Sequence, residues 1–225
     1  MARPAVTPRS RRAPLSRDRV LRTALRLVDD GGLPALSMRK LALELGVEVM
    51  SLYYHVKNKD EILTGILGMV LSEMEPPKAG RDPMRAIRAS AVARHDTLRR
   101  HPWVNEVTNA PDRVTPAQLV YMEALLSTLR EAGFSPRMTH HAYHILESHI
   151  VGSTLWEAGI AAAIPKGKLP DLAKTVMERL PVEQFPYTHE HIQQHVGKLA
   201  KGDQNPFEFG LDLILEGLER LRGQA

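Results

Sequence analysis

Apolar residues recur at helical spacing along most of the chain, whereas the alternation typical of β-strands is nearly absent. The first stripe, at positions i, i+4, i+7 and i+8, consists of Val20, Ala24, Leu27 and Val28. Comparable stripes predict helices over residues 17–30, 37–45, 48–56, 58–75, 83–100, 102–109, 116–132, 136–158, 171–180, 189–201 and 206–222. The pattern therefore predicts an all-α fold.

Capping residues mark where several of these helices begin. Four helices share one signal, in which an N-cap side chain stands directly before a proline at the first helical position. The four pairs are Asp82-Pro83, Thr115-Pro116, Ser135-Pro136 and Asn205-Pro206. Ser16 and Ser37 are predicted N-caps of the first two helices.

Residues 36–59, LSMRKLALELGVEVMSLYYHVKNK, are predicted to form two short helices joined by a tight turn at Gly46. Leu52 and Val56 can pack inward. The side chains left outside are Val49, Met50, Ser51, Tyr53, Tyr54 and His55. They combine apolar groups, hydroxyls and polar tips, and no carboxylate follows Glu48. This composition is typical of a recognition helix that reads base edges in the DNA major groove.

The segment resembles the DNA-binding domain of the TetR family, and the motifs RKLALELGVE and LYYHVKNK carry the resemblance. Residues 20–32 and 60–71 resemble the family's first and fourth helices. Residues 130–136 resemble a helix break in the family, and residues 207–221 resemble its last helix. The implied organisation is a helix-turn-helix, three-helix domain at residues 16–60 and a larger helical ligand-binding and dimerisation domain at residues 61–225.

The resemblance also implies which residues contact DNA. Arg39 would reach the DNA from the first helix of the motif, and Lys59 would contact phosphate. The full set is Ser37, Arg39, Val49, Met50, Ser51, Tyr53, Tyr54, His55 and Lys59. Val49 and Met50 replace a polar residue and a proline of the family's tetracycline-responsive members. We therefore expect a different operator, in which thymine methyl groups suit the apolar pair.

Positive charge is concentrated at the same end of the chain. Residues 1–60 hold 12 Lys+Arg against 6 Asp+Glu, and the remaining residues hold 18 against 20. This excess suits a polyanionic partner. Residues 1–15, rich in Arg and Pro, are predicted to be a disordered basic arm, which either adds DNA contacts or serves as a solubilising tail.

The sequence also narrows the other classes of site and partner. Without cysteine, neither a disulfide nor a thiolate metal site can form. Neither a long apolar run nor a signal-peptide segment is present, so we expect a cytoplasmic protein with no membrane partner. The common catalytic and nucleotide-binding motifs are missing from the sequence, so we expect no enzyme activity and no cofactor.

The last predicted helix is unusually apolar. In the TetR family the corresponding helix joins an earlier long helix in a four-helix bundle between two subunits, and residues 136–158 would be that partner here. The predicted dimer-interface residues are Leu211, Ile214, Leu215 and Leu218. The alternative is that this helix completes a monomeric core.

Large apolar or amphipathic side chains on the central helices are candidate walls of an inducer pocket. They are Leu98, Trp103, Val107, Met122, Tyr143, Leu146 and Trp156. Each could equally be ordinary core. Glu75 and Thr108 stand where the family's tetracycline-binding members have histidines that hold the drug and its magnesium ion. This difference argues against tetracycline–magnesium as the inducer.

Histidines occur in two pairs at i, i+4 spacing, His140 with His144 and His191 with His195, and Glu147 follows the first pair. Such pairs can chelate zinc or nickel, but helix-surface histidines also reach this spacing by chance. No motif supplies a third ligand, so no metal site is assigned.

Together these features predict a homodimeric repressor that binds a pseudo-palindromic operator in double-stranded DNA and is released by a small-molecule inducer of unknown identity. Two alternatives remain, a DNA-binding regulator without a small-molecule ligand and a metal-responsive regulator that uses the histidine pairs. Activation in place of repression is equally compatible with the sequence.

Overall fold

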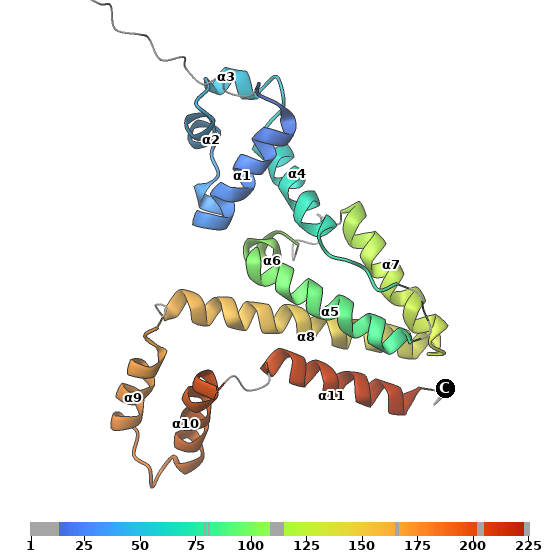
Figure 1. Ribbon diagram of the computed structural model, residues 1–225, viewed down its shortest axis with the longest axis vertical. Coiled ribbons are helices and arrows are strands. Elements are labelled where there is room, and N and C mark those ends of the chain that lie inside the picture. The colour runs from blue at the N-terminus through green and yellow to red at the C-terminus, as the bar shows by residue number, and fades with distance from the viewer. Residues whose placement is uncertain are drawn as a thin grey trace, which may run out of the picture. The chain divides into compact units, whose positions relative to one another are not determined.

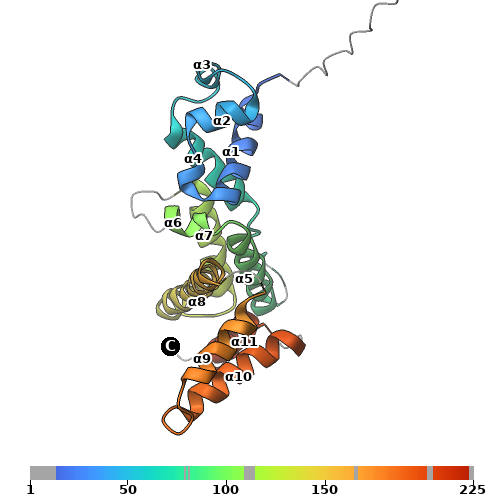
Figure 2. The ribbon, with the colours of Figure 1, turned by 90° about the vertical axis from the view of Figure 1, so that its left-hand side faces the viewer.

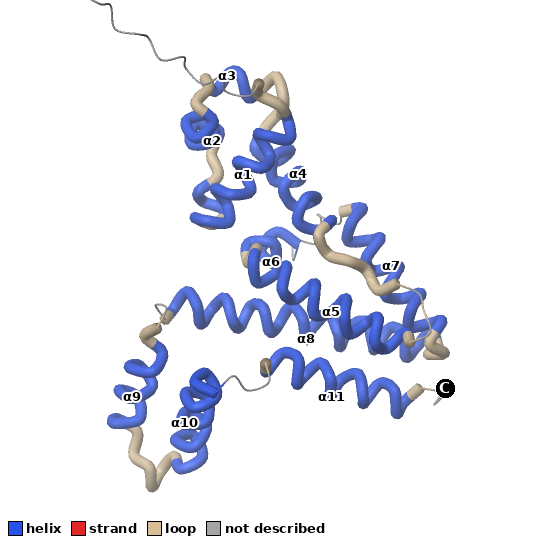
Figure 3. The backbone as a smooth tube through the Cα atoms, viewed as in Figure 1, coloured by secondary structure: helices blue, strands red, loops and turns tan. Residues whose placement is uncertain are grey.

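Figure 1 shows the computed structural model, which describes residues 14–78, 80, 82–108, 115–164, 167–201 and 205–222, with only the backbone for 195–201. Every regular element in these ranges is a helix (Figure 3), as the sequence predicted. The chain forms two compact units, Met1–Met69 and Val70–Ala225. The division falls within α4 (Lys59–Ser72), later than the boundary expected after residue 60.

The first unit contains α1 (Arg17–Gly31), the 3₁₀ turn η1 (Leu33–Ala35), α2 (Met38–Leu45), α3 (Val49–Leu52) and the first part of α4. The hydroxyl oxygen of Ser16 caps α1 by accepting a hydrogen bond from the Arg19 N–H at 3.2 Å. Gly32 ends the helix with φ 69°. The fully buried core side chains are Val20, Ala24, Leu41, Leu52, Ile62 and Ile66.

The helix predicted over residues 48–56 is shorter than expected. It is α-helical only over Val49–Leu52, and the chain then continues as tight turns. The Tyr53 N–H donates to the Met50 carbonyl at 3.2 Å, and the His55 N–H donates to the Leu52 carbonyl at 2.9 Å. These are i to i−3 bonds, which are typical of a 3₁₀ turn. Tyr53, Tyr54 and His55 have only modest helix propensity, which favours this early end of the α-helix.

The second unit contains the remainder of α4, α5 (Pro83–Arg100), α6 (Trp103–Thr108), α7 (Pro116–Glu131), α8 (Pro136–Ala163), α9 (Leu169–Arg179), α10 (Pro186–Lys201) and α11 (Pro206–Leu221). All four predicted cap–proline signals begin helices, because Asp82, Thr115, Ser135 and Asn205 each accept a backbone hydrogen bond. None of the described helices combines the length and the apolar character needed to cross a membrane.

The long helix α8 is the centre of this unit. α5, α7 and α11 all contact it, and Figure 1 shows α5 and α11 running along its length. Its buried residues are Thr139, Ala142, Leu146, Ile150 and Thr154. α9 and α10 pack together as a helical hairpin, which Figure 1 shows after the end of α8 and Figure 2 shows from the side.

Three further helices differ from their predicted limits by three residues or more, and one of them, α10, begins at Pro186 instead of residue 189. α8 extends beyond residue 158, because Gly159 does not adopt the left-handed conformation and the alanines that follow favour helix. α4 ends at Ser72 instead of residue 75, where Glu73 and Met74 turn with i to i−3 hydrogen bonds.

Three stacked rings join α5, α8 and α11. The imidazole of His95 lies 3.7 Å from the Phe207 ring, centroid to centroid, and that of His149 lies 5.0 Å from it, both nearly parallel to it. His149 Nε2 also lies 2.9 Å from the Phe207 carbonyl oxygen, and His95 Nε2 lies 3.1 Å from Glu157. Burial lowers the pKa of His95, an effect that Glu157 partly offsets. The stack fixes the start of α11.

An ion pair between Arg88 of α5 and Asp212 of α11 also joins these two helices. Arg88 Nε donates to Asp212 Oδ1 at 2.6 Å, and Arg88 Nη2 reaches Asp212 Oδ2 at 3.1 Å and Glu208 Oε2 at 2.9 Å. The hydrogen bonds from Arg88 lower the pKa of Asp212. Both nitrogens on one edge of the guanidinium are therefore used in a complete two-bond fork.

Gly210 allows α11 to approach the stack, because a Cβ there would lie 2.5 Å from the His149 ring. We predict that Gly210→Ala lowers the free energy of unfolding by about 1–3 kcal/mol through overpacking. A double-mutant cycle measured by chemical denaturation provides the control. In a His149→Ala background the penalty should largely disappear, and an unchanged penalty would contradict the proposed steric cause.

Candidate DNA-binding surface and ligand cavity

The turn between α2 and α3 has the geometry expected of a helix-turn-helix. Ser37 caps α2 by accepting a hydrogen bond from the Lys40 N–H at 3.1 Å. Gly46 is left-handed, with φ 67° and ψ 40°, and its N–H donates to the Leu43 carbonyl at 3.1 Å. The Val47 N–H donates to the Ala42 carbonyl at 3.0 Å. A side chain at Gly46 would strain this backbone.

The residues after the turn separate into an inner and an outer set. Leu52 and Val56 are buried. Met50 is exposed, as are Tyr53 at 47% and Tyr54 at 87%, so neither tyrosine belongs to the core. Val49, Ser51 and His55 are partly exposed. The outer set therefore offers apolar, hydroxyl and imidazole groups together on one stretch of the first unit.

Basic side chains lie on either side of this stretch. Arg39 and Lys40 are exposed on α2, and Lys57 and Lys59 are exposed at the start of α4. The outer set, Arg39, Lys59 and the exposed cap residue Ser37 make up the nine residues of the predicted DNA-binding group, and all nine lie on accessible parts of the first unit.

A local network orders the start of α4. Asn58 Oδ1 accepts a hydrogen bond from the Glu61 N–H at 2.8 Å, and Glu61 Oε2 accepts one from the Lys57 N–H at 2.8 Å. The bond from the Lys57 backbone lowers the pKa of Glu61. Arg17 of α1 lies 3.4 Å from the same carboxylate. This network holds the turn that presents Lys57 and Lys59.

The predicted pocket walls of the second unit differ in how deeply they are buried. Leu98, Trp103, Val107 and Leu146 are buried, whereas Met122 and Tyr143 are half-buried. Trp156 is 72% exposed.

Leu98 and Trp156 line separate hollows. Leu98 contributes to a cavity of about 20 Å³, which is lined by Leu71, Met74, Arg94, Leu98, Val104, Asn105, Thr108, Ala117, Gln118 and Tyr121. Trp156 contributes to an apolar hollow of about 260 Å³ against α9 and α10.

Arg94 is the charged residue of the smaller cavity, and it was not among the predicted site residues. Its Nη2 lies 2.7 Å from Glu147 Oε2, and its guanidinium carbon lies 4.5 Å from the centre of the Tyr121 ring. Burial raises the pKa of Glu147, an effect that Arg94 partly offsets. Burial also raises the pKa of Tyr121 and of Tyr143. The sequence offered one signal for this pair, because Arg94 and Glu147 each place a charge within the apolar stripe of their helix, α5 and α8 respectively.

The residues predicted at the dimer interface lie mainly inside the subunit. Leu211, Leu215 and Leu218 are buried, and Ile214 is partly exposed. The apolar side chains that α11 leaves exposed are Phe209, Leu213 and Leu221.

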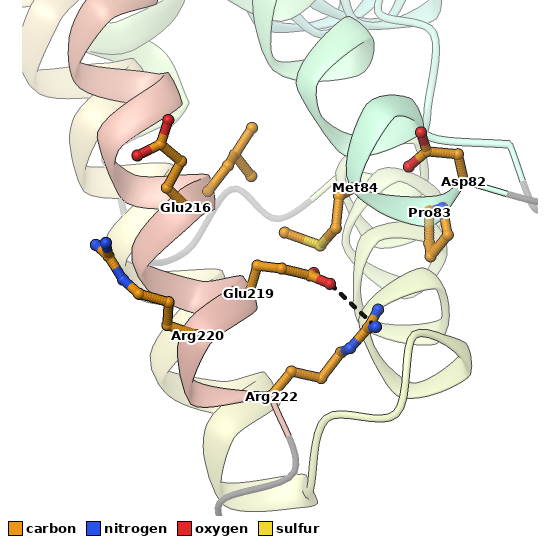
Figure 4. Close-up of a pocket in the computed structure, with 8 residues that line it drawn as sticks. Asp82, Pro83, Met84, Glu216, Glu219, Arg220 and Arg222 are labelled. Atoms are coloured by element: carbon orange, nitrogen blue, oxygen red, sulfur yellow. Dashed lines mark ion pairs between the residues drawn. The ribbon is translucent and has the colours of Figure 1, made fainter.

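Leu215 also lines an open cleft of about 620 Å³ between the start of α5 and the end of α11. Acidic and basic groups share this cleft, and a dashed line marks the ion pair of Glu219 with Arg222 (Figure 4). Glu219 Oε1 lies 3.0 Å from Arg222 Nη2. Charged residues of both signs therefore line the cleft.

The two histidine pairs differ in what can be said of them. The rings of His140 and His144 lie 4.5 Å apart, centroid to centroid, while the side chain of His195 lies outside the described residues. Among the side chains that the structure describes, no three histidines or carboxylates form a group that could hold a metal ion.

Two family descriptions match the chain. "Bacterial regulatory proteins, tetR family" matches residues 20–66, and "Tetracyclin repressor-like, C-terminal domain" matches residues 76–222. The HTH-type transcriptional repressor DrrR1 of Streptomyces coeruleorubidus is 31% identical over 223 residues, covering 93% of this chain and 79% of the relative. The class C tetracycline repressor protein of Escherichia coli is 30% identical, covering 92% of each chain.

A solved structure resembles both units. The complex of the Streptomyces coelicolor TetR family protein ActR with actinorhodin matches with a TM-score of 0.73 and 27% identity, covering 94% of this chain and 99% of that one. These matches confirm the resemblance seen in the motifs around Gly46. The chain belongs to the TetR family of transcriptional regulators.

Proposed function

We propose that the protein is a homodimeric repressor, and that each subunit places α3 in one half-site of a pseudo-palindromic DNA operator. The outer set of residues after Gly46 carries this proposal, because it provides base-reading groups without a carboxylate. Arg39, Lys57 and Lys59 would contact phosphates or a guanine edge. The two half-sites would lie about one helical turn apart, or a multiple of it.

The limits of the two domains are part of the same proposal. Residues 16–60 would be the DNA-binding domain and residues 61–225 the ligand-binding and dimerisation domain. Most of the basic arm predicted at 1–15 lies outside the described residues.

A small molecule bound in the second unit would release the operator. The similarity to ActR, whose structure contains actinorhodin, supports a ligand for this chain. α4 begins in the first unit and ends in the second, and its residue Leu71 lines the small cavity. A ligand that displaces Leu71 would act directly on the helix that leads to the DNA-binding motif. Release requires that the ligand bind more tightly to the form with low operator affinity.

A regulator without a small-molecule ligand is the second candidate. The observation that favours it is the size of the inner cavity, since about 20 Å³ holds little more than one water molecule. Titration of actinorhodin into a protein–operator complex would help to separate the two, because release supports the ligand-responsive form.

We predict that Tyr53→Ala weakens binding to the specific operator strongly but changes binding to random DNA little. The operator would be recovered by selection from random duplexes, and affinity would be measured by fluorescence anisotropy. Tyr187→Ala is the matched control, because Tyr187 is an exposed tyrosine of the second unit. Parental operator affinity in Tyr53→Ala would overturn the assignment of the recognition segment.

Lys59→Ala is expected to weaken binding to every DNA sequence. Loss of one phosphate contact should also reduce the slope of log K against log salt by about 1. Titrations at several salt concentrations measure the slope, and an unchanged slope would show that Lys59 makes no phosphate contact.

The dimer should depend on the exposed side of α11. Leu213 is 52% exposed within the subunit, so Leu213→Glu should leave the subunit folded while it splits the dimer. Leu119→Glu on α7 is the control, because Leu119 is 51% exposed. Light scattering after size exclusion gives the mass, and circular dichroism reports the fold. If Leu213→Glu remains a dimer, the interface lies elsewhere.

A further inference from the structure

Glu61 places a carboxylate close to the basic residues at the start of α4. It follows the exposed residues Lys57 and Lys59 in the same short stretch of chain. A negative charge on a surface that meets DNA repels the phosphates, so by its charge alone Glu61 would weaken operator binding. Its contacts within the first unit indicate the opposite effect.

Both oxygens of this carboxylate engage other parts of the first unit. Oε2 accepts a hydrogen bond from the Lys57 N–H at 2.8 Å, and Oε1 lies 3.4 Å from Arg17 Nη2 of α1. The Glu61 N–H donates to Asn58 Oδ1 at 2.8 Å. One residue therefore ties both the preceding turn and the first helix to α4. The guanidinium of Arg17 also offsets part of the negative charge, which reduces the repulsion of phosphates.

The bond at Lys57 is important for the recognition segment, because that segment is only partly helical. The α-helix ends at Leu52, whose carbonyl accepts hydrogen bonds from the N–H groups of His55 at 2.9 Å and Val56 at 3.0 Å. Lys57 comes directly after Val56, and its N–H is held by Glu61. The exposed side chains between these anchors are therefore fixed by Leu52 at one end and by Glu61 at the other.

We propose that Glu61 is a positioning residue for operator recognition, which raises the specific affinity through its bond to the Lys57 backbone although its charge repels DNA. The inference rests on the proposed function, because it concerns the same DNA-binding surface. Apparent affinity falls with the fraction of molecules whose binding surface is correctly formed, so a loosened turn lowers operator affinity. Binding to random DNA depends mainly on phosphate contacts and does not require the base-reading side chains.

Three variants separate the hydrogen bond from the charge. Glu61→Gln keeps an acceptor for the Lys57 N–H but removes the charge, Glu61→Asp keeps the charge on a shorter side chain, and Glu61→Ala removes both. Affinities for the selected operator and for a random duplex are measured by fluorescence anisotropy. We expect the ratio of operator to random affinity to fall at least about fivefold in Glu61→Ala and Glu61→Asp, and to stay within about twofold of the parent in Glu61→Gln.

Asp60→Ala is the matched control, because Asp60 is the adjacent exposed carboxylate and makes none of the contacts that hold the turn. It removes the same charge, so its affinity ratio should stay within about twofold of the parent. Circular dichroism and thermal unfolding verify that each variant folds, and a general loss of folding would lower both affinities together. If Glu61→Ala does not fold, the comparison of Glu61→Asp with Glu61→Gln decides.

Several results would overturn the proposal. They are a parental affinity ratio in Glu61→Ala, an equal loss in Glu61→Gln and Glu61→Ala, or an equal loss in Asp60→Ala. If the parent binds its operator and one of these results is found, only the role of Glu61 fails. If the parent selects no operator from random duplexes, the proposed repressor function fails, and the role of Glu61 in it fails as well.

Discussion

The packing of α8 against its neighbours determines much of the second unit. Its buried stripe runs from Thr139 to Thr154, and α5, α7 and α11 all contact the helix. Because these neighbours meet along one helix, polar groups on α8 become interior groups as well. Glu147 meets Arg94 of α5 in this way, and His149 meets Phe207 of α11. The packing of the core therefore decides which polar side chains of α8 meet those of its neighbours.

Two arginines of α5, Arg88 and Arg94, illustrate how position changes the use of the same chemistry. Arg88 lies near the surface and completes its fork with Asp212, which suits a structural link between helices. Arg94 is more deeply buried, and its Nη2 lies 2.7 Å from Glu147 Oε2, while its Nε has no hydrogen-bond partner among the described residues. The same guanidinium chemistry therefore makes a complete two-bond link at Arg88 and an incomplete one at Arg94.

The recognition segment follows a different principle. Its α-helix ends at Leu52, and the exposed tyrosines are presented by tight turns. Leu52 and Val56 anchor these turns from the inside, while the network of Asn58 and Glu61 holds the next helix start. Reading groups are therefore positioned by a few local contacts, and a short helix is sufficient.

The sequence by itself determined the features that depend on neighbouring residues. Caps such as Ser37, the turn at Gly46 and the exposed set around Tyr53 could be predicted, because each arises within a few residues. Tertiary structure alone decided which side of α11 is buried, since Leu211 and Phe209 are comparably apolar and only packing against α5 and α8 separates them. It also decided the pairing of Arg94 with Glu147, because no local pattern shows which two distant charges will meet in a core.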